Sequence, residues 1–383
     1  MSAQSSRPSS RIDFIDLLRG WAVIVMIETH VVNASLSPAL SSETFFQYLK
    51  FVNGLVAPSF LFASGLSYAV ATHRKIPDYL SFSSPLFQQM RRLLTVAIIG
   101  YLLHVPLLPV WRMATEATPE QWQSFFQVDI LQCIAVSLLI LQILLLITRS
   151  ESRLYKTAFG VAAAVVVLSP YVWQIDYWEQ LPWIAAGYMN GIRFSLFPLF
   201  PWLSFLFAGA LAGYMLVRTT QDLPRYSSTL AWAGGSMILL SYLADSAGAQ
   251  LLPPHNYWQT SPAFFLLRLG IVMLLGSLLV WSSTAGSGKF RAPVLLFGQE
   301  SLLVYVAHLL ILYGDFGEFN LQKSIGGTFG YVQAGLLSSA LIALMWLAAV
   351  RWHRIKRESP RLKRFVTTAA IVTVAGLLLF GEG

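Results

Sequence analysis

The chain has 383 residues, of which 56% are hydrophobic and only 11% are charged, and its formal net charge is +8. Because soluble domains carry about 25% charged residues, this composition excludes an ordinary soluble globular protein. The positive charge does not indicate binding to nucleic acid, since the basic residues are spread over short loops and form no basic domain.

Eleven apolar segments approach the roughly 20 residues that a helix needs to cross a bilayer. In chain order they cover 12–33, 50–72, 88–108, 125–148, 156–173, 195–217, 229–246, 262–283, 293–313, 330–350 and 365–381. The sequence therefore predicts an all-α polytopic membrane protein with about eleven transmembrane helices in one bundle. We expect a cytoplasmic tail at 1–11 and a single transmembrane domain over 12–383. No short helix pair broken by Gly or Pro, of the kind that transporters use, is visible in the sequence.

The distribution of Lys and Arg predicts the orientation of this bundle. If the N-terminus is cytoplasmic, the cytoplasmic side holds 21 of the 26 basic residues, including Arg7, Arg11 and Arg19. The five on the outer side are Lys50, Arg112, Arg193, Arg268 and Lys323. An odd number of helices then places the C-terminus outside. The pattern predicts a multi-pass protein of the cell inner membrane.

The first segment carries ionisable residues inside a stretch that should lie in the bilayer. At about 100° per residue, Asp16, Arg19 and His30 share one stripe of the helix, and Glu28 points to roughly the opposite face. Such side chains are expensive in hydrocarbon and indicate function unless they are paired. A capping Asp16 and a snorkelling Arg19 would need no function, but that explanation does not account for His30 or Glu28.

The second and third segments add polar groups at opposite ends. Asn53 lies near the outer face, and the Gly and Pro residues of the second segment permit close helix packing or a kink, with packing favoured for Gly65. Arg91 and Arg92 lie at the cytoplasmic end of the third helix. There they either bind phosphate groups in a bidentate manner or snorkel to the interface.

The fourth and ninth segments carry polar side chains as well. Asp129 stands at the outer start of the fourth helix, where a carboxylate favours the helix N-terminus, and Gln132 lies one turn deeper. Ser301, Tyr305 and His308 share one face of the ninth helix. That face either lines a cavity or forms a structural hydrogen-bond network.

Two outer connections, 174–194 and 247–261, combine Trp and Tyr with carboxylates and amides. They either bind sugars or form the interfacial aromatic belt of a membrane protein. No HExxH, G-x-S-x-G or P-loop motif occurs. We therefore expect no metal, and nucleophilic serine chemistry has no support.

Several of these motifs follow the order of a known family. They are Asp16-Leu17-Leu18-Arg19-Gly20, Asn53-Gly54 with Pro58, Phe60 and Gly65, Ile130-Leu131-Gln132, and the stretch 301–308. Over about residues 11–313 the chain resembles the heparan-α-glucosaminide N-acetyltransferase family, and the stretch 197–202 with Gly209 and Gly213 resembles its bacterial branch. The resemblance implies a bundle of about eleven helices that transfers an acetyl group from cytosolic acetyl-CoA to a sugar across the membrane.

Two positions depart from the pattern of that family. His30 stands where the lysosomal enzyme has Asn, and residues 48–50 contain no His where that enzyme has its supposed catalytic one. The spacing from Arg19 to His30 instead resembles related acyltransferases that O-acetylate bacterial surface glycans, in which a His at that place is thought to be catalytic. The acceptor therefore need not be an amino sugar.

From the residues and this resemblance we predict a membrane-embedded, acyl-CoA-dependent acyltransferase with acetyl-CoA as the donor substrate. The predicted catalytic residues are His30, His308 and Asn53. The residues predicted to hold CoA are Arg19, Arg91, Arg92 and Asp16. The residues predicted to bind the acceptor are Glu28, Asp129, Gln132, Tyr305 and Ser301. His30 would deprotonate the acceptor or carry the acyl group. The expected partners are acyl-CoA, a sugar or glycan acceptor and the lipid bilayer, with no nucleic acid, and a homodimer stays open.

Two other functions stay open on the sequence alone. A proton-coupled transporter or flippase of a lipid-linked sugar could use Glu28, His30 and His308 as a proton relay. A non-enzymatic assembly subunit would tolerate loss of His30. Binding of CoA separates the acyltransferase from the transporter, because a transporter should show none.

Overall fold

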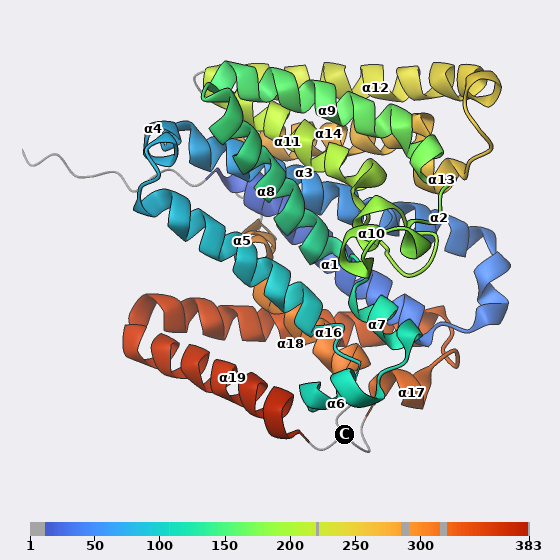
Figure 1. Cartoon of the computed structure of the whole chain (residues 1–383), viewed down its shortest axis with the longest axis vertical. Helices are drawn as coiled ribbons and strands as arrows, with labels where there is room; N and C mark the ends of the chain where they lie inside the picture. The colour runs from blue at the N-terminus through green and yellow to red at the C-terminus, as the bar shows by residue number, and fades with distance from the viewer. Residues whose placement is uncertain (1–11, 107, 220–221, 285–290, 315–319, 382–383) are drawn as a thin grey trace, which may run out of the picture.

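The computed structural model describes residues 12–106, 108–219, 222–284, 291–314 and 320–381 (Figure 1). Within these ranges all regular elements are helices, and one isolated β-bridge joins Leu36 to Phe329. The predicted tail at 1–11 and the terminal Gly383 lie outside the described residues. The all-helical prediction is confirmed for the described part of the chain.

A helix or a pair of helices covers each of the eleven apolar segments. These long elements are α1 (Asp13–Ser35), α2 (Thr44–Asn53) with α3 (Val56–His73), α5 (Ser84–Leu102), α8 (Ile130–Thr148), α9 (Glu151–Val172), α11 (Leu199–Arg218), α12 (Leu223–Leu251), α14 (Pro262–Thr284), α15 (Arg291–Gln299) with α16 (Ser301–Tyr313), α18 (Tyr331–Glu358) and α19 (Pro360–Phe380). By length and hydropathy, seven spans in the described ranges could cross a membrane, or eight if the bent pair α15–α16 counts as one. The chain is thus a multi-pass membrane protein. The count of eleven spans stays a prediction, because α1, α5 and α12 are not among those seven.

Short helices fill the connections. They are η1 (Pro38–Ser42), α4 (Ile76–Leu80), α6 (Val110–Glu116), α7 (Pro119–Phe125), η2 (Tyr177–Glu179), α10 (Trp183–Met189), α13 (Tyr257–Thr260) and α17 (Leu321–Ile325). In Figure 1, α4 and the turn between α18 and α19 lie on the left, whereas α10, α13 and α17 lie on the right. The connections therefore gather at two opposite ends of the bundle.

Hydrogen bonds and ion pairs between connections join only connections at the same end of the bundle in the four examples that follow. On the predicted outer side, Ser37 N donates to Phe329 O at 2.9 Å and Gln174 Nε2 donates to Pro254 O at 2.9 Å. On the predicted inner side, His73 lies 2.7 Å from Glu151, and Arg291 lies 2.8 Å from Asp13. Each contact joins two connections that the sequence assigns to the same side. The alternation of the connections therefore fits the prediction, while the choice of the cytoplasmic end rests on the basic residues.

Glycines let several long helices touch backbone to backbone. A Cβ built on Gly65 of α3 would overlap Leu206 O of α11, and one built on Gly20 of α1 would overlap Val294 O of α15. Small residues have this role in membrane bundles, where close backbone approach strengthens van der Waals packing. As a result α1 packs tightly among α3, α14, α15, α16 and α18, and its polar residues face several helices at once.

The ninth apolar segment is broken, although no broken helix pair is visible in the sequence. α15 and α16 meet at an angle of 82° at Glu300. The Glu300 carboxylate is buried and binds His353 at 2.9 Å and Lys356 at 2.5 Å, both from α18. Gly298 lies so close to α1 that a Cβ would overlap Asp16 O. These contacts from two other helices explain the bend, and the expectation that no broken pair exists was wrong.

Candidate active site

Two histidines from distant parts of the chain lie together inside the bundle. The ring centroids of His30 on α1 and His308 on α16 are 5.1 Å apart, with the rings inclined at 67°. Tyr313 stacks edge-on to His30 at 5.8 Å and donates its hydroxyl hydrogen to His30 O at 3.0 Å. The structure therefore brings together two of the three residues predicted to be catalytic.

The hydrogen bonding of His308 determines which of its nitrogens is a base. Its Nδ1 lies 2.7 Å from Val304 O, and a carbonyl oxygen can only accept, so the neutral ring carries its hydrogen on Nδ1. The Nε2 atom then bears a free lone pair. It is buried and has no hydrogen-bond partner among the described residues. A buried polar atom without a partner is unfavourable, so Nε2 is available to a bound molecule.

A second group of polar side chains connects the histidine pair to the outer end of α8. Asp129 caps α8 by accepting from Ile130 N at 2.6 Å, as its position in the sequence predicts. Its other oxygen accepts from the Tyr305 hydroxyl at 3.1 Å and lies 3.7 Å from Nε2 of His104. The Tyr305 ring lies 5.9 Å from the His308 ring. Asp129 and Tyr305 therefore lie beside the histidine pair.

Gln132 lies one turn deeper in α8 and is completely buried. Neither its Oε1 nor its Nε2 has a hydrogen-bond partner among the described residues. Gly100 makes room for it, because a Cβ there would lie 2.7 Å from Gln132 Oε1. A buried amide with both polar atoms unpaired is unfavourable without a ligand, and the binding of the acceptor by Gln132 stays a prediction.

Glu28 and Asn53 form a separate polar group. The Glu28 carboxylate lies beside the side chain of Asn53, the last residue of α2. No hydrogen bond or ring contact joins Asn53 to either histidine in the described chain. Ser301 is also apart, because it begins α16 at the bend, about 10 Å along the axis from His308.

The residues predicted to hold CoA lie toward the other end of the bundle. Arg19 donates to Ser67 Oγ of α3 at 2.7 Å and lies 3.8 Å from Asp16, so it sits between α1 and α3. Arg91 and Arg92 are exposed on α5. Exposed guanidinium groups remain able to bind phosphate.

The short helix α4 places a buried tyrosine hydroxyl near the arginine pair of α5. Tyr79 of α4 is buried near Arg92 and the side chain of Thr72. Burial raises the pKa of the Tyr79 hydroxyl, and these two neighbours oppose that shift. Tyr79 therefore remains a neutral hydrogen-bonding group beside the exposed arginines.

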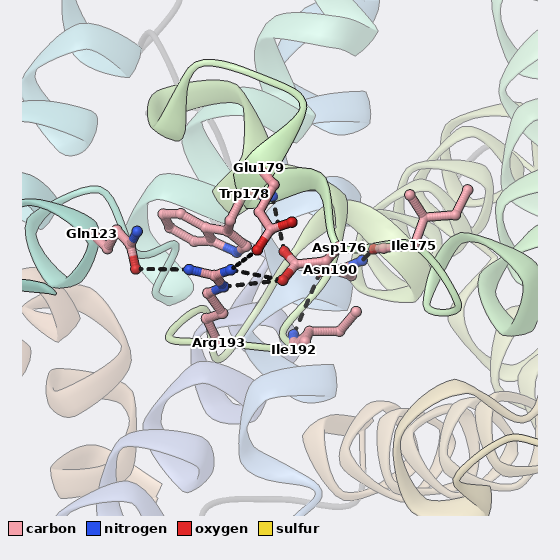
Figure 2. Close-up of polar contacts among 8 residues, drawn as sticks. All are labelled: Gln123, Ile175, Asp176, Trp178, Glu179, Asn190, Ile192 and Arg193. Carbon is pink, nitrogen blue, oxygen red and sulfur yellow. Dashed lines mark hydrogen bonds and ion pairs between the residues drawn. The ribbon is translucent and has the colours of Figure 1, made fainter. Parts of the chain in front are cut away.

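Ion pairs and hydrogen bonds of Arg193 crosslink the outer connection 174–194 (Figure 2). Arg193 binds Asp176 at 2.8 Å, Glu179 at 3.1 Å and Gln123 of the preceding outer connection at 3.4 Å. The hydrogen bond to Asp176 raises the pKa of the Arg193 guanidinium. Trp178 is only 3% exposed. Because these charges are paired and this indole is buried, they stabilise the connection and leave little for a sugar.

Sequence reasoning did not include Tyr313, His104 and Arg268 among the site residues. Tyr313 follows His308 on the same predicted helix, and His104 lies at the outer end of the third segment. Their positions near the outer ends of apolar segments were the available signal. In the described residues, no group of three or more His, Cys, Asp or Glu side chains could hold a metal ion.

Comparison with known proteins identifies the family. The family model described as heparan-alpha-glucosaminide N-acetyltransferase, catalytic, matches residues 11–245. The matched region contains His30, Asn53, the arginine pair of α5 and Asp129, and it ends before His308. No curated protein matches the chain. Since the match covers more than half of the chain, this multi-pass membrane protein belongs to the heparan-α-glucosaminide N-acetyltransferase catalytic family.

Proposed function

We propose that the protein is a membrane-embedded acyltransferase that moves an acetyl or another acyl group from cytosolic acyl-CoA to a sugar or glycan acceptor on the opposite side of the membrane. The observation that carries this proposal is the pairing of His30 with His308, in a chain of an acetyltransferase family. Neutral imidazole is the usual acid–base group near pH 7.

His30 is the group that contacts the acceptor in this proposal. Its ring is partly exposed, and its nitrogens have no hydrogen-bond partner among the described residues. The imidazole takes the proton of an acceptor hydroxyl or amine while the acceptor oxygen or nitrogen attacks the thioester carbonyl. The carbon–sulfur bond then breaks, and CoA leaves as a thiolate that receives the proton from the imidazolium. An acyl-His30 intermediate reaches the same products in two steps.

The neighbours of His30 have distinct tasks. Nε2 of His308 is the second free base, and its ring is held by Val304. Tyr305 already donates its hydroxyl hydrogen to Asp129, so it orients this part of the site and has no hydrogen left for an oxyanion. The amide of Gln132, which has no hydrogen-bond partner among the described residues, can serve as a donor, and a donor placed before the reaction stabilises developing negative charge.

The donor enters from the end of the bundle that carries the exposed arginines. CoA is polyanionic and does not cross hydrocarbon, so its phosphates remain at Arg91 and Arg92. Arg19 lies on the same stripe of α1 as His30, between α1 and α3. In the proposal, the pantetheine arm follows this stripe and brings the thioester to His30.

The test uses the purified protein in lipid nanodiscs. We expect acetyl-CoA to bind, as measured by calorimetry or by a rise in unfolding temperature, and we expect thioester consumption when a pool of bacterial or animal glycans is added. Free CoA should compete with acetyl-CoA. A protein that binds neither acetyl-CoA nor CoA is not an acyl-CoA-dependent transferase.

A further inference from the structure

A charged side chain inside α14 has no ionic partner in the described part of the chain. Arg268 is seven residues into the candidate span Pro262–Ser283. Among the described residues, no carboxylate forms an ion pair with it, and its Nε atom is buried without a hydrogen-bond partner. A cation at such a place is expensive unless an anion or a polar cavity compensates it.

The neighbours of Arg268 hold its guanidinium in one orientation. The guanidinium carbon lies 3.9 Å from the centroid of the Phe264 ring. A Cβ on Gly54, at the break between α2 and α3, would overlap Nη2 of Arg268. Gly54 follows Asn53, whose Oδ1 is also buried without a partner among the described residues. The guanidinium donors therefore contact the residue that follows an acceptor without a partner in the described chain.

Aromatic rings extend from Arg268 to the outer connection. The ring centroid of Phe264 lies 5.7 Å from that of Trp258 and 5.9 Å from that of Tyr257. The ring centroids of Trp258 and Tyr257 are 5.2 Å apart. Trp258 is 57% exposed. Unlike the connection 174–194, this connection presents an exposed indole, which is linked to the half-buried guanidinium of Arg268 through the Phe264 ring.

These groups match one chemical class of ligand. A guanidinium binds carboxylate and phosphate oxygens in a bidentate manner, an indole face packs on the apolar face of a sugar ring, and Asn53 Oδ1 accepts from a hydroxyl. Glu28, beside Asn53, offers further acceptor oxygens to hydroxyl groups. We propose that Arg268, Trp258 and Asn53 bind the acceptor of the transfer reaction, and that this acceptor is an acidic sugar bearing a carboxylate or phosphate group. The inference rests on the proposed function, because it names the substrate class of the same enzyme.

The test measures binding without acyl-CoA, using the full chain in nanodiscs of neutral phosphatidylcholine. The probes are methyl glucuronoside, glucose 6-phosphate and methyl glucoside, the last having no acidic group. We expect both acidic sugars to raise the unfolding temperature at concentrations about tenfold lower than the neutral sugar, because a charge-assisted contact adds to binding. Arg268→Gln should remove the preference, and Arg268→Lys should keep part of it.

Arg112→Gln is the matched control. Arg112 is also predicted to lie on the outer side but is already paired with Glu116 at 2.9 Å, so this variant should keep the preference for acidic sugars. If wild type does not distinguish the acidic sugars from the neutral one, or if Arg268→Gln still does, the inference is wrong. Should Arg268→Gln fail to fold, the preference of wild type and its weakening in Arg268→Lys decide the question.

A lipid phosphate is the other source of the same oxyanion. In nanodiscs that contain phosphatidylglycerol, stabilisation that depends on Arg268 while the acidic sugars have no effect would make Arg268 a lipid contact and overturn the acceptor assignment. Acetyl-CoA binding is measured separately on the same variants. Loss of the sugar preference with CoA binding intact contradicts only the acceptor class, whereas absent CoA binding contradicts the proposed function itself.

Discussion

One hydrogen bond, from Nδ1 of His308 to Val304 O, leaves Nε2 of that ring as a buried base without a partner among the described residues. His30 faces it with a ring that no described residue hydrogen-bonds. Single substitutions can therefore show which of the two adjacent imidazoles acts as the base in the proposed reaction.

His30→Ala should abolish acyl transfer while acetyl-CoA binding and the unfolding temperature stay close to wild type. Positioned acid–base groups contribute typically about 10²–10⁴-fold in rate, and the vacated, partly exposed space can admit water. Transfer is measured with radiolabelled acetyl-CoA. His73→Ala is the control, because His73 binds Glu151 in an inner connection away from the pair. If His30→Ala retains about a third of the activity while His308→Ala has none, the base is His308.

The double substitution Arg91→Ala and Arg92→Ala should weaken acetyl-CoA binding with little loss of folding, because both side chains are exposed. Hydrogen bonds to charged groups contribute on the order of 1.5–3 kcal/mol each, and calorimetry reads the change directly. Arg149→Ala with Arg153→Ala removes the same charge from another inner connection and should leave binding unchanged. Wild-type affinity in the first variant would move the phosphate site to Arg19.

At the scale of elements, hydropathy located the long helices well. Apolar stretches of spanning length are a local property of the chain, so all eleven segments coincide with a helix or helix pair. The bend at Glu300 escaped prediction because its partners, His353 and Lys356, come from another helix. The short helices of the connections also escaped it, since amphipathic turns of a few residues give a weak periodic signal.

The backbone contact between α3 and α11 leads to a prediction about helix packing. Gly65→Ala should lower the stability of the bundle by about 1–3 kcal/mol, the usual effect of overpacking, because the new Cβ would overlap Leu206 O. Gly160→Ala on α9 is the matched control, because no atom of the described residues lies within 4 Å of its Cβ position. Thermal unfolding in the same detergent compares the two. Equal unfolding temperatures for both variants would mean that α3 and α11 do not pack this closely.

At the scale of the whole molecule, the two ends of the bundle differ in charge and in structure. Basic residues concentrate at one end, whereas α10, α13 and α17 gather at the other (Figure 1). α19 has no buried residue, and its exposed apolar side chains fit contact with lipid. The orientation and the number of spans are properties of this whole arrangement.

Reporter fusions test that arrangement. A fusion after Lys75 should be active only as a cytoplasmic reporter, and a fusion at Gly383 only as an extracytoplasmic one, because the predicted odd number of spans would place the two termini on opposite sides. A phosphatase and a fluorescent protein that require opposite compartments provide the pair of measurements. A Gly383 fusion that fluoresces in the cytoplasm would show an even number of spans and contradict the predicted eleven.

The sequence by itself determined the class of the protein, the positions of its long helices and its family, which the match over residues 11–245 confirms. These follow from composition, local hydropathy and short motifs, none of which depends on knowing the tertiary contacts between residues. Only the tertiary structure brought His30 to His308, bent the chain at Glu300 and set Arg268 against Gly54. Each of those contacts joins helices far apart in the chain, and how closely helices approach is decided by packing across the bundle, which no local pattern encodes.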